Sequence, residues 1–155
     1  MKTISELQAG DWAPAFEALD EAGQKHSLGA CKGKTIVLYF YPKDHTSGCT
    51  TEACDFRDHY KSFLKKGAVV FGVSPDSSKS HLSFKSKHEL PFALLIDEDK
   101  KLCRAYGVWK EKSMYGRKYM GVERSTFVIG PDGRIKDVLR KVSVPDHVKS
   151  LLETL

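Results

Sequence analysis

The sequence has only four cysteines among its 155 residues, and no two of them form the C-x-x-C pair of thioredoxin-type redox sites. Its longest apolar run, IVLYFY, is far too short to cross a membrane. The N-terminal stretch MKTISELQAGDWAP lacks the apolar segment of a secretion signal, so we expect a reducing, cytoplasmic location. In such a compartment cysteines are more often catalytic or metal-binding than joined in stable disulfides.

Internal repeats, low-complexity segments and nucleic-acid-binding motifs are also missing from the sequence. Hydrophobic residues make up 41% and charged residues 29%, which indicates a globular chain that folds as a single domain over residues 1–155. The net charge of +5 comes from lysines that are spread along the chain, most of them with acids nearby. We therefore predict a solvated basic surface and no nucleic-acid partner.

Short runs of β-branched and aromatic residues predict five buried strands, at 35–41, 68–74, 92–97, 125–130 and 134–140. Helices are predicted at 49–65, 77–89 and 99–106, and in the tail with Pro145 in its first turn. Strands and helices alternate at first, and the GPDGR turn then joins the last two strands as a hairpin. This order predicts an α/β fold, a thioredoxin-like sandwich in which helices flank a central mixed sheet.

Cys49 stands where the strand 35–41 gives way to a helix. The free N–H groups and the dipole at a helix N-terminus stabilise an anion, so a cysteine there is favoured as the nucleophilic thiolate. Gly48 allows a ligand to approach the backbone closely, and Thr46 offers a hydroxyl within one turn. The sequence therefore predicts an activated thiol at Cys49, whereas Cys31 and Cys103 lack this setting and are expected to be buried and inert.

The five-residue separation of Cys49 and Cys54 has a physical consequence if both lie on one helix. Their Cα atoms would be about 8–9 Å apart, on faces that differ by roughly 140°. A disulfide needs Cα atoms within about 7 Å, so the helix would have to unwind before the bond could form. The pair therefore predicts a switch, with Cys54 as a resolving cysteine that captures an oxidised Cys49.

A zinc site is the alternative for this region, with His45, Cys49, Cys54 and His59 as its four ligands. On one continuous helix these side chains do not converge, and the spacing is wider than the usual C-x2-4-C pair. We therefore expect no metal at these residues.

The segment YPKDHTSGCTTEACDFRD resembles the signature of the peroxiredoxins, and in particular of the Q-type, or bacterioferritin comigratory protein-like, members. Pro42, Thr46 and Cys49 supply the P-x-x-x-T-x-x-C motif of that family. The segment 10–23 resembles the family's opening hairpin, and 106–129 resembles its later segment with an arginine just before a strand. The resemblance covers nearly the whole chain. It implies a thioredoxin-like fold, reduction of hydrogen peroxide and organic hydroperoxides, and no metal, haem or flavin cofactor.

The resemblance also implies a role for each matched residue. Cys49 would be the peroxidatic cysteine, and the substrate would bind at Pro42, at the Thr46 hydroxyl and at the N–H groups of Gly48 and Cys49. Arg124 would hold the thiolate and stabilise the charge that develops. Glu52, one helical turn after Cys49, would orient Arg124.

The resemblance implies a catalytic cycle in which Cys49 becomes a sulfenic acid and then forms a disulfide with Cys54. A thioredoxin-like or glutaredoxin-like dithiol partner would reduce this disulfide. The enzyme is expected to be a monomer. Ser47 departs from the family, which commonly has proline there, so the pocket is expected to be slightly less preorganised. Two other functions would fit the fold, a protein disulfide oxidoreductase and a non-enzymatic redox-sensing or chaperone module. The absent C-x-x-C pair argues against the first of them.

Overall fold

Strand β3 (Thr35–Phe40) lies at the centre of a five-stranded sheet and is buried along almost its whole length. It pairs in parallel with β4 and antiparallel with β8. The strand order is β5-β4-β3-β8-β9, with β4 (Ala68–Ser74), β5 (Ala93–Ile96), β8 (Ser125–Ile129) and β9 (Ile135–Leu139). The predicted mixed sheet and its five strands are confirmed. The computed structural model describes residues 6–155. Residues 1–5 lie outside it, and with them the start of the N-terminal stretch in which the sequence shows no secretion signal.

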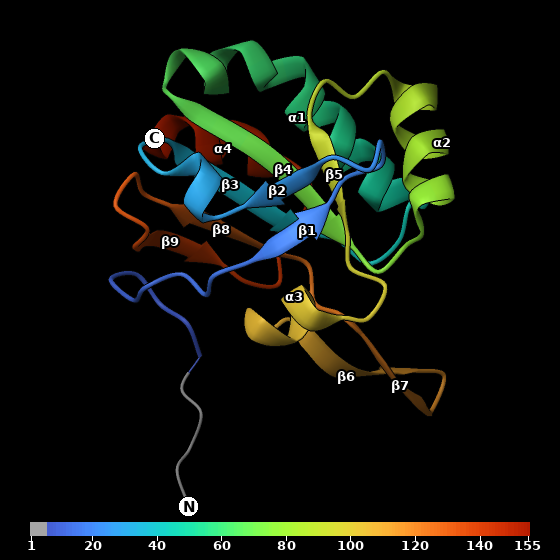
Figure 1. The fold of residues 1–155 in the computed structure, drawn as a ribbon. Coiled ribbons are helices and arrows are strands. Elements are labelled where there is room, and N and C mark those ends of the chain that lie inside the picture. Colours follow the sequence, from blue (N-terminus) through green and yellow to red (C-terminus); the bar gives the residue numbers. More distant parts are fainter. Residues whose placement is uncertain (1–5) are drawn as a thin grey trace, which may run out of the picture.

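Helices cover both faces of the sheet (Figure 1). One face packs against α1 (Ser47–Lys65), α2 (Ser78–His88) and α4 (His147–Thr154). The other face packs against α3 (Lys101–Ala105) and the hairpin of β1 (Glu17–Leu19) and β2 (Lys25–Ser27), which leads into the short 3-10 helix η1 (Gly29–Cys31). Side chains of β3 point alternately into the two cores, Leu38 into one and Tyr39 into the other.

The apolar stripe predicted for residues 49–65 anchors α1 to the sheet. Ala53, Phe56 and Phe63 are fully buried, and Tyr60 is half-buried at the edge of the stripe. The ring of Phe56 stacks on Tyr39 of β3 with 4.5 Å between ring centroids. Burial of an aromatic ring contributes about 1.5–3 kcal/mol, so this stripe fixes the position of the helix that begins beside Cys49.

Two local features differ from the sequence-based expectation. Residues 109–122 form a separate hairpin of β6 (Trp109–Met114) and β7 (Arg117–Val122), which the sequence did not predict because most of its side chains are not buried and no apolar alternation marks it. Helix α4 begins only at His147, with Asp146 at its N-cap in a left-handed conformation (φ 62°). Pro145 therefore precedes the helix instead of standing in its first turn.

The pairing of β3 with β8 brings the segment that follows β3 close to the segment that precedes β8. Phe40 at the end of β3 lies opposite Ser125 at the start of β8. Arg124 directly precedes Ser125, so it lies beside the loop that leads from β3 into α1. The hairpin turn predicted between β8 and β9 is present, with the Gly133 N–H donating to the Gly130 carbonyl at 3.0 Å.

Candidate active site

Cys49 lies in the first turn of α1, as the sequence predicted. Thr46 is the N-cap, and its carbonyl accepts the first helical hydrogen bond from the Thr50 N–H at 2.8 Å. The N–H groups of Ser47, Gly48 and Cys49 precede that bond, so the helix offers them no carbonyl of its own. Cys49 is 1% exposed. Its sulfur therefore sits in a nearly dry position at the positive end of a 19-residue helix.

Arg124 connects Cys49 to Glu52. Its Nη2 donates to Cys49 Sγ at 3.2 Å, and its Nη1 donates to Glu52 Oε1 at 2.5 Å. A Cβ atom on Gly48 would lie 3.4 Å from Nη2, so the backbone of Gly48 lies close beside the guanidinium. Burial lowers the pKa of Arg124, but the charges of Glu52 and Cys49 outweigh it and raise that pKa. Arg124 is thus a fixed cation between Cys49 and Glu52.

Glu52 is fully enclosed although it is an acid in the second turn of a helix. Burial raises the pKa of Glu52 to about 7, against the opposing effect of Arg124. The carboxyl group is therefore poised between its two protonation states near neutral pH. The structure brings Glu52, Arg124 and Cys49 together as the resemblance implied.

Thr46 and Pro42 flank this cluster in the loop between β3 and α1. The Thr46 hydroxyl donates to the Lys43 carbonyl at 2.8 Å, which leaves its oxygen free to accept a hydrogen bond from a substrate O–H group. Pro42 is half-buried and follows the buried end of β3 by two residues. Both residues lie where the sequence placed them.

Cys54 shares the continuous helix α1 with Cys49 and is partly exposed. All four cysteines, which all fall within the described residues, are free thiols. The two cysteines are therefore separated by intact helix in this reduced form, and a bond between them requires α1 to unwind.

A buried ion pair under the loop was not foreseen from the sequence. Asp44 Oδ2 lies 2.7 Å from His81 Nδ1, and both side chains are fully buried. The other ring nitrogen, Nε2, lies 2.9 Å from the Leu95 carbonyl, which can only accept, so both ring nitrogens carry protons. Tyr41 and Ser80 donate to the same carboxylate at 2.6 and 2.8 Å. Local patterns could not pair Asp44 and His81, because they stand 37 residues apart.

The four residues weighed as zinc ligands have other contacts. His59 Nδ1 lies 2.9 Å from the Asp55 carbonyl, and the His45 ring packs edge-on against Phe84. Within residues 6–155, one group of potential metal ligands gathers closely, namely Asp44, Asp76 and His81. Asp44 and His81 are already bonded to each other, and the Asp44 N–H donates to Asp76 Oδ2 at 2.8 Å.

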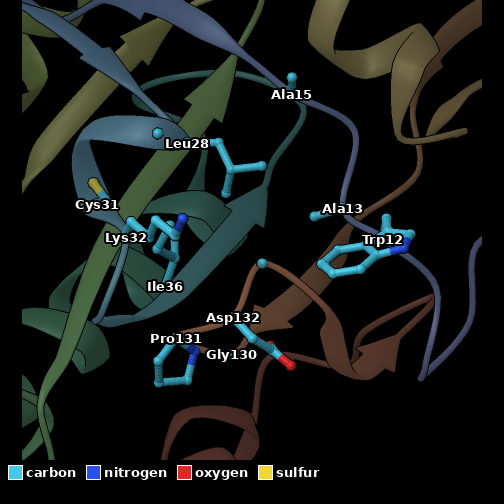
Figure 2. Close-up of a pocket in the computed structure, with 12 residues that line it drawn as sticks. Trp12, Ala13, Ala15, Leu28, Cys31, Lys32, Ile36, Gly130, Pro131 and Asp132 are labelled. Carbon is cyan, nitrogen blue, oxygen red and sulfur yellow. The ribbon is translucent and has the colours of Figure 1, made fainter.

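Cys31 and Cys103 lie away from this cluster. Cys103 is fully buried, and burial, followed by Asp97, raises its pKa. Cys31 is only partly buried, which corrects the expectation for that residue, although burial still raises its pKa. It lines an apolar cavity of about 310 Å³ with Trp12, Leu28, Ile36 and Pro131 (Figure 2). Ile36 stands at the start of β3, so this cavity opens at the end of that strand remote from Cys49.

Known proteins match both the sequence and the fold of this chain. The AhpC/TSA family profile matches residues 9–138. Peroxiredoxin Bcp of Bacillus subtilis is 54% identical over 149 residues, which cover 96% of this chain and 95% of that protein. The chain belongs to the peroxiredoxins of the AhpC/TSA family. It is therefore a thiol peroxidase with the thioredoxin-like fold that the sequence predicted.

Solved structures place this peroxiredoxin among the Q-type members. The bacterioferritin comigratory protein of Xanthomonas campestris, studied for its alkyl peroxide reduction activity, has a TM-score of 0.89 and 43% identity, covering 94% of this chain and 96% of that one. A PrxQ mutant of Xylella fastidiosa has a TM-score of 0.92 and 39% identity, covering 97% and 96%. Within the part of the peroxiredoxin that the structure describes, every helix is too short or too polar to cross a membrane.

Proposed function

We propose that Cys49 is the peroxidatic cysteine and that it reduces hydrogen peroxide and organic hydroperoxides. The Cys49 thiolate attacks one peroxide oxygen in line with the O–O bond. The S–O bond forms as the O–O bond breaks, and the substrate's own proton passes to the departing oxygen. The products are a Cys49 sulfenate and either water or an alcohol. The alkyl peroxide reduction described for the X. campestris relative supports organic hydroperoxides as substrates.

The contact of Arg124 Nη2 with Cys49 Sγ, at 3.2 Å, is the observation that carries this proposal. The cation favours the thiolate before the reaction and stabilises negative charge on the peroxide oxygens during it. The N–H groups of Gly48 and Cys49 add donors at the same helix end, and Thr46 accepts the substrate O–H. Pro42 shapes the loop that carries them, and Glu52 orients Arg124.

Cys54 completes the cycle as the resolving cysteine. After the first turns of α1 unwind, the Cys54 thiol condenses with the Cys49 sulfenic acid, giving a disulfide and water. A thioredoxin-like or glutaredoxin-like dithiol then reduces this disulfide by thiol exchange and is itself oxidised. We infer that the chain works as a monomeric single domain in a reducing, cytoplasmic compartment, where such dithiols are available.

Peroxide consumption by the purified protein with a thioredoxin-type reductant tests the assignment. Cys49→Ser should abolish turnover, because the nucleophile is gone. Cys54→Ser should lose turnover with the dithiol partner but still form one sulfenic acid, which proceeds to sulfinic acid under excess peroxide. Cys31→Ser is the matched control and should keep wild-type turnover. Substantial turnover by Cys49→Ser, or wild-type cycling by Cys54→Ser with the dithiol, would refute the corresponding role.

A further inference from the structure

Glu52 buries a carboxylate oxygen that lacks a hydrogen-bond donor. Its Oε1 accepts from Arg124, but Oε2 has no hydrogen-bond partner among the described residues, and the side chain is fully buried. Nearly all buried polar atoms in native proteins are hydrogen-bonded, and an unpaired one costs about 1–3 kcal/mol. The surroundings of Oε2 should therefore contain the group that supports it.

His147, the first residue of α4, lies opposite this oxygen. Its Nε2 is 3.9 Å from Glu52 Oε2 and 3.1 Å from Thr126 Oγ1. The His147 side chain is 6% exposed, and its ring packs edge-on against Phe56, which follows Glu52 by about one turn of α1. Packing thus holds the imidazole in the interior, and a movement of roughly 1 Å would bring Nε2 within hydrogen-bond distance of Oε2.

The imidazole is suited to this contact because it is neutral. Burial, and then the charge of Arg124, lowers the pKa of His147 to about 4. At neutral pH the ring therefore has one N–H, and in the Nε2–H tautomer that group lies between Thr126 Oγ1 and Glu52 Oε2. A neutral donor supports the carboxylate without replacing Arg124 as its charged partner.

We propose that His147 is a positioning residue for the peroxidatic site: it supports the free oxygen of the Glu52 carboxylate, so that the other oxygen keeps Arg124 on Cys49. The inference rests on the role proposed for Cys49. It extends the site to α4, the last helix of the chain, which packs against α1. The resulting chain of side-chain contacts leads from His147 to Glu52, from Glu52 to Arg124, and from Arg124 to the Cys49 sulfur.

These contacts also depend on the part of α1 that must unwind before Cys49 and Cys54 can form a disulfide. Glu52 lies between Cys49 and Cys54, so unwinding that joins the two cysteines must carry the carboxylate away from Arg124 and His147. The support from His147 therefore belongs to the folded, reduced form, in which peroxide is attacked.

Several titratable groups surround the Glu52 carboxylate and influence its protonation. They come from four parts of the fold: Cys49 and Asp55 from α1, Tyr39 from β3, Arg124 from the turn between β7 and β8, and His147 from α4. Arg124 favours the carboxylate, whereas the Cys49 thiolate and Asp55 oppose it. A neutral donor at Oε2 also favours the carboxylate. Its removal should therefore shift the Glu52 titration to higher pH.

The test compares His147→Leu with His147→Gln, whose amide nitrogen can take the place of Nε2. Val148→Ala is the control for packing of α4, because Val148 follows His147 in α4, is buried, and has an apolar side chain that cannot donate a hydrogen bond to Glu52. The Glu52 carboxyl carbon is titrated by NMR in the reduced protein, and stopped-flow mixing with hydrogen peroxide gives the rate of Cys49 oxidation from pH 5 to 8.

His147→Leu should shift the Glu52 titration to higher pH and slow oxidation at pH 7 by roughly three- to tenfold. His147→Gln should bring the Glu52 titration and the oxidation rate most of the way back to their wild-type values. Val148→Ala should leave both quantities at their wild-type values. Wild-type behaviour of His147→Leu, or the same shift in Val148→Ala, would overturn the role of His147.

The wild-type protein provides a measurement that needs no variant. The ring nitrogens of His147 should report the Glu52 titration by NMR, and their insensitivity to it would overturn the contact. If wild-type Cys49 fails to react with peroxide, the proposed function is wrong; the two NMR titrations still decide whether His147 supports Glu52.

Discussion

At the scale of single residues, the site depends on one arginine that serves two partners. Arg124 places one nitrogen on the Cys49 sulfur and another on the Glu52 carboxylate. The planar guanidinium makes both contacts at once because its donors point in fixed, diverging directions. A lysine ammonium is a single point charge on a flexible stem, so it would supply charge without this geometry.

Replacing Arg124 should therefore separate charge from geometry. We expect Arg124→Ala to lower the fraction of Cys49 present as thiolate at pH 7 and to slow its oxidation by about 10²–10³-fold, the usual effect of losing one stabilising donor. Arg124→Lys should keep part of the thiolate and recover only part of the rate. Ultraviolet absorbance of the thiolate and stopped-flow oxidation measure the two quantities. An Arg124→Ala protein that matches wild type in both would remove Arg124 from the site.

At the scale of elements, the loop before α1 is fixed by contacts to parts of the fold distant in sequence. Asp44 bonds to His81 of α2, and His81 in turn bonds to the Leu95 carbonyl of β5. Burial raises the pKa of Asp44, but the hydrogen bond and charge of His81 and the hydrogen bonds from Tyr41 and Ser80 together outweigh it and lower that pKa. Burial lowers the pKa of His81, but the hydrogen bond and the charge of Asp44 outweigh it and raise that pKa. The ion pair thus joins the active-site loop, α2 and the sheet edge.

These shifts predict how stability depends on pH. The contribution of Asp44 is complete above its usual pKa of 3.8 and is lost as pH falls through its lowered, folded-state value. The contribution of His81 is complete below its usual pKa of 6.5 and is lost as pH rises through its raised value. The pair should therefore stabilise the protein most between about pH 4 and 6.5.

Asp44→Asn should lower the free energy of unfolding by about 3–5 kcal/mol within that window, because it leaves a buried charge unpaired. The difference from wild type should shrink toward alkaline pH, as His81 loses its proton in the folded state. Urea unfolding at several pH values measures it. Asp58→Asn removes the exposed pair with Arg57 and should cost no more than about 1 kcal/mol. A pH-independent cost for Asp44→Asn would contradict the ionic account.

At the scale of the whole molecule, α1 belongs to both the site and the core. Glu52, Ala53 and Phe56 are fully buried and stand within or next to the segment that must unwind for Cys49 to meet Cys54. Removing a buried phenylalanine from a core costs about 3–5 kcal/mol, whereas a disulfide that closes so short a loop restores only about 2 kcal/mol. The disulfide form should therefore be the less stable of the two redox forms.

We expect oxidation by one equivalent of peroxide to lower the thermal midpoint by about 2–10 °C. Calorimetry of the reduced and oxidised wild type measures the change, and reduction by a dithiol should reverse it. Cys54→Ser cannot form the bond and should keep most of its reduced-state midpoint under the same treatment. An oxidised wild type as stable as the reduced form would show that Phe56 and its neighbours stay packed when the disulfide forms.

The sequence by itself determined the features that depend on neighbours along the chain. Apolar runs located the strands, the 49–65 stripe located α1, and the strand-to-helix junction located Cys49 and its donors. The motif around Pro42, Thr46 and Cys49 was sufficient for the family. All these signals have periods or spacings of a few residues, which the sequence displays directly.

The resemblance implied that Arg124 meets Cys49, but only the tertiary structure shows how distant side chains come together. Arg124 reaches Cys49, 75 residues away, because β8 pairs antiparallel with β3 in a register that ends at Phe40 and Ser125. The same long-range packing buries Glu52, pairs Asp44 with His81 and sets His147 of α4 behind the site. Such contacts leave no periodic trace, since they arise from the order and register of the strands and from helix packing on the sheet.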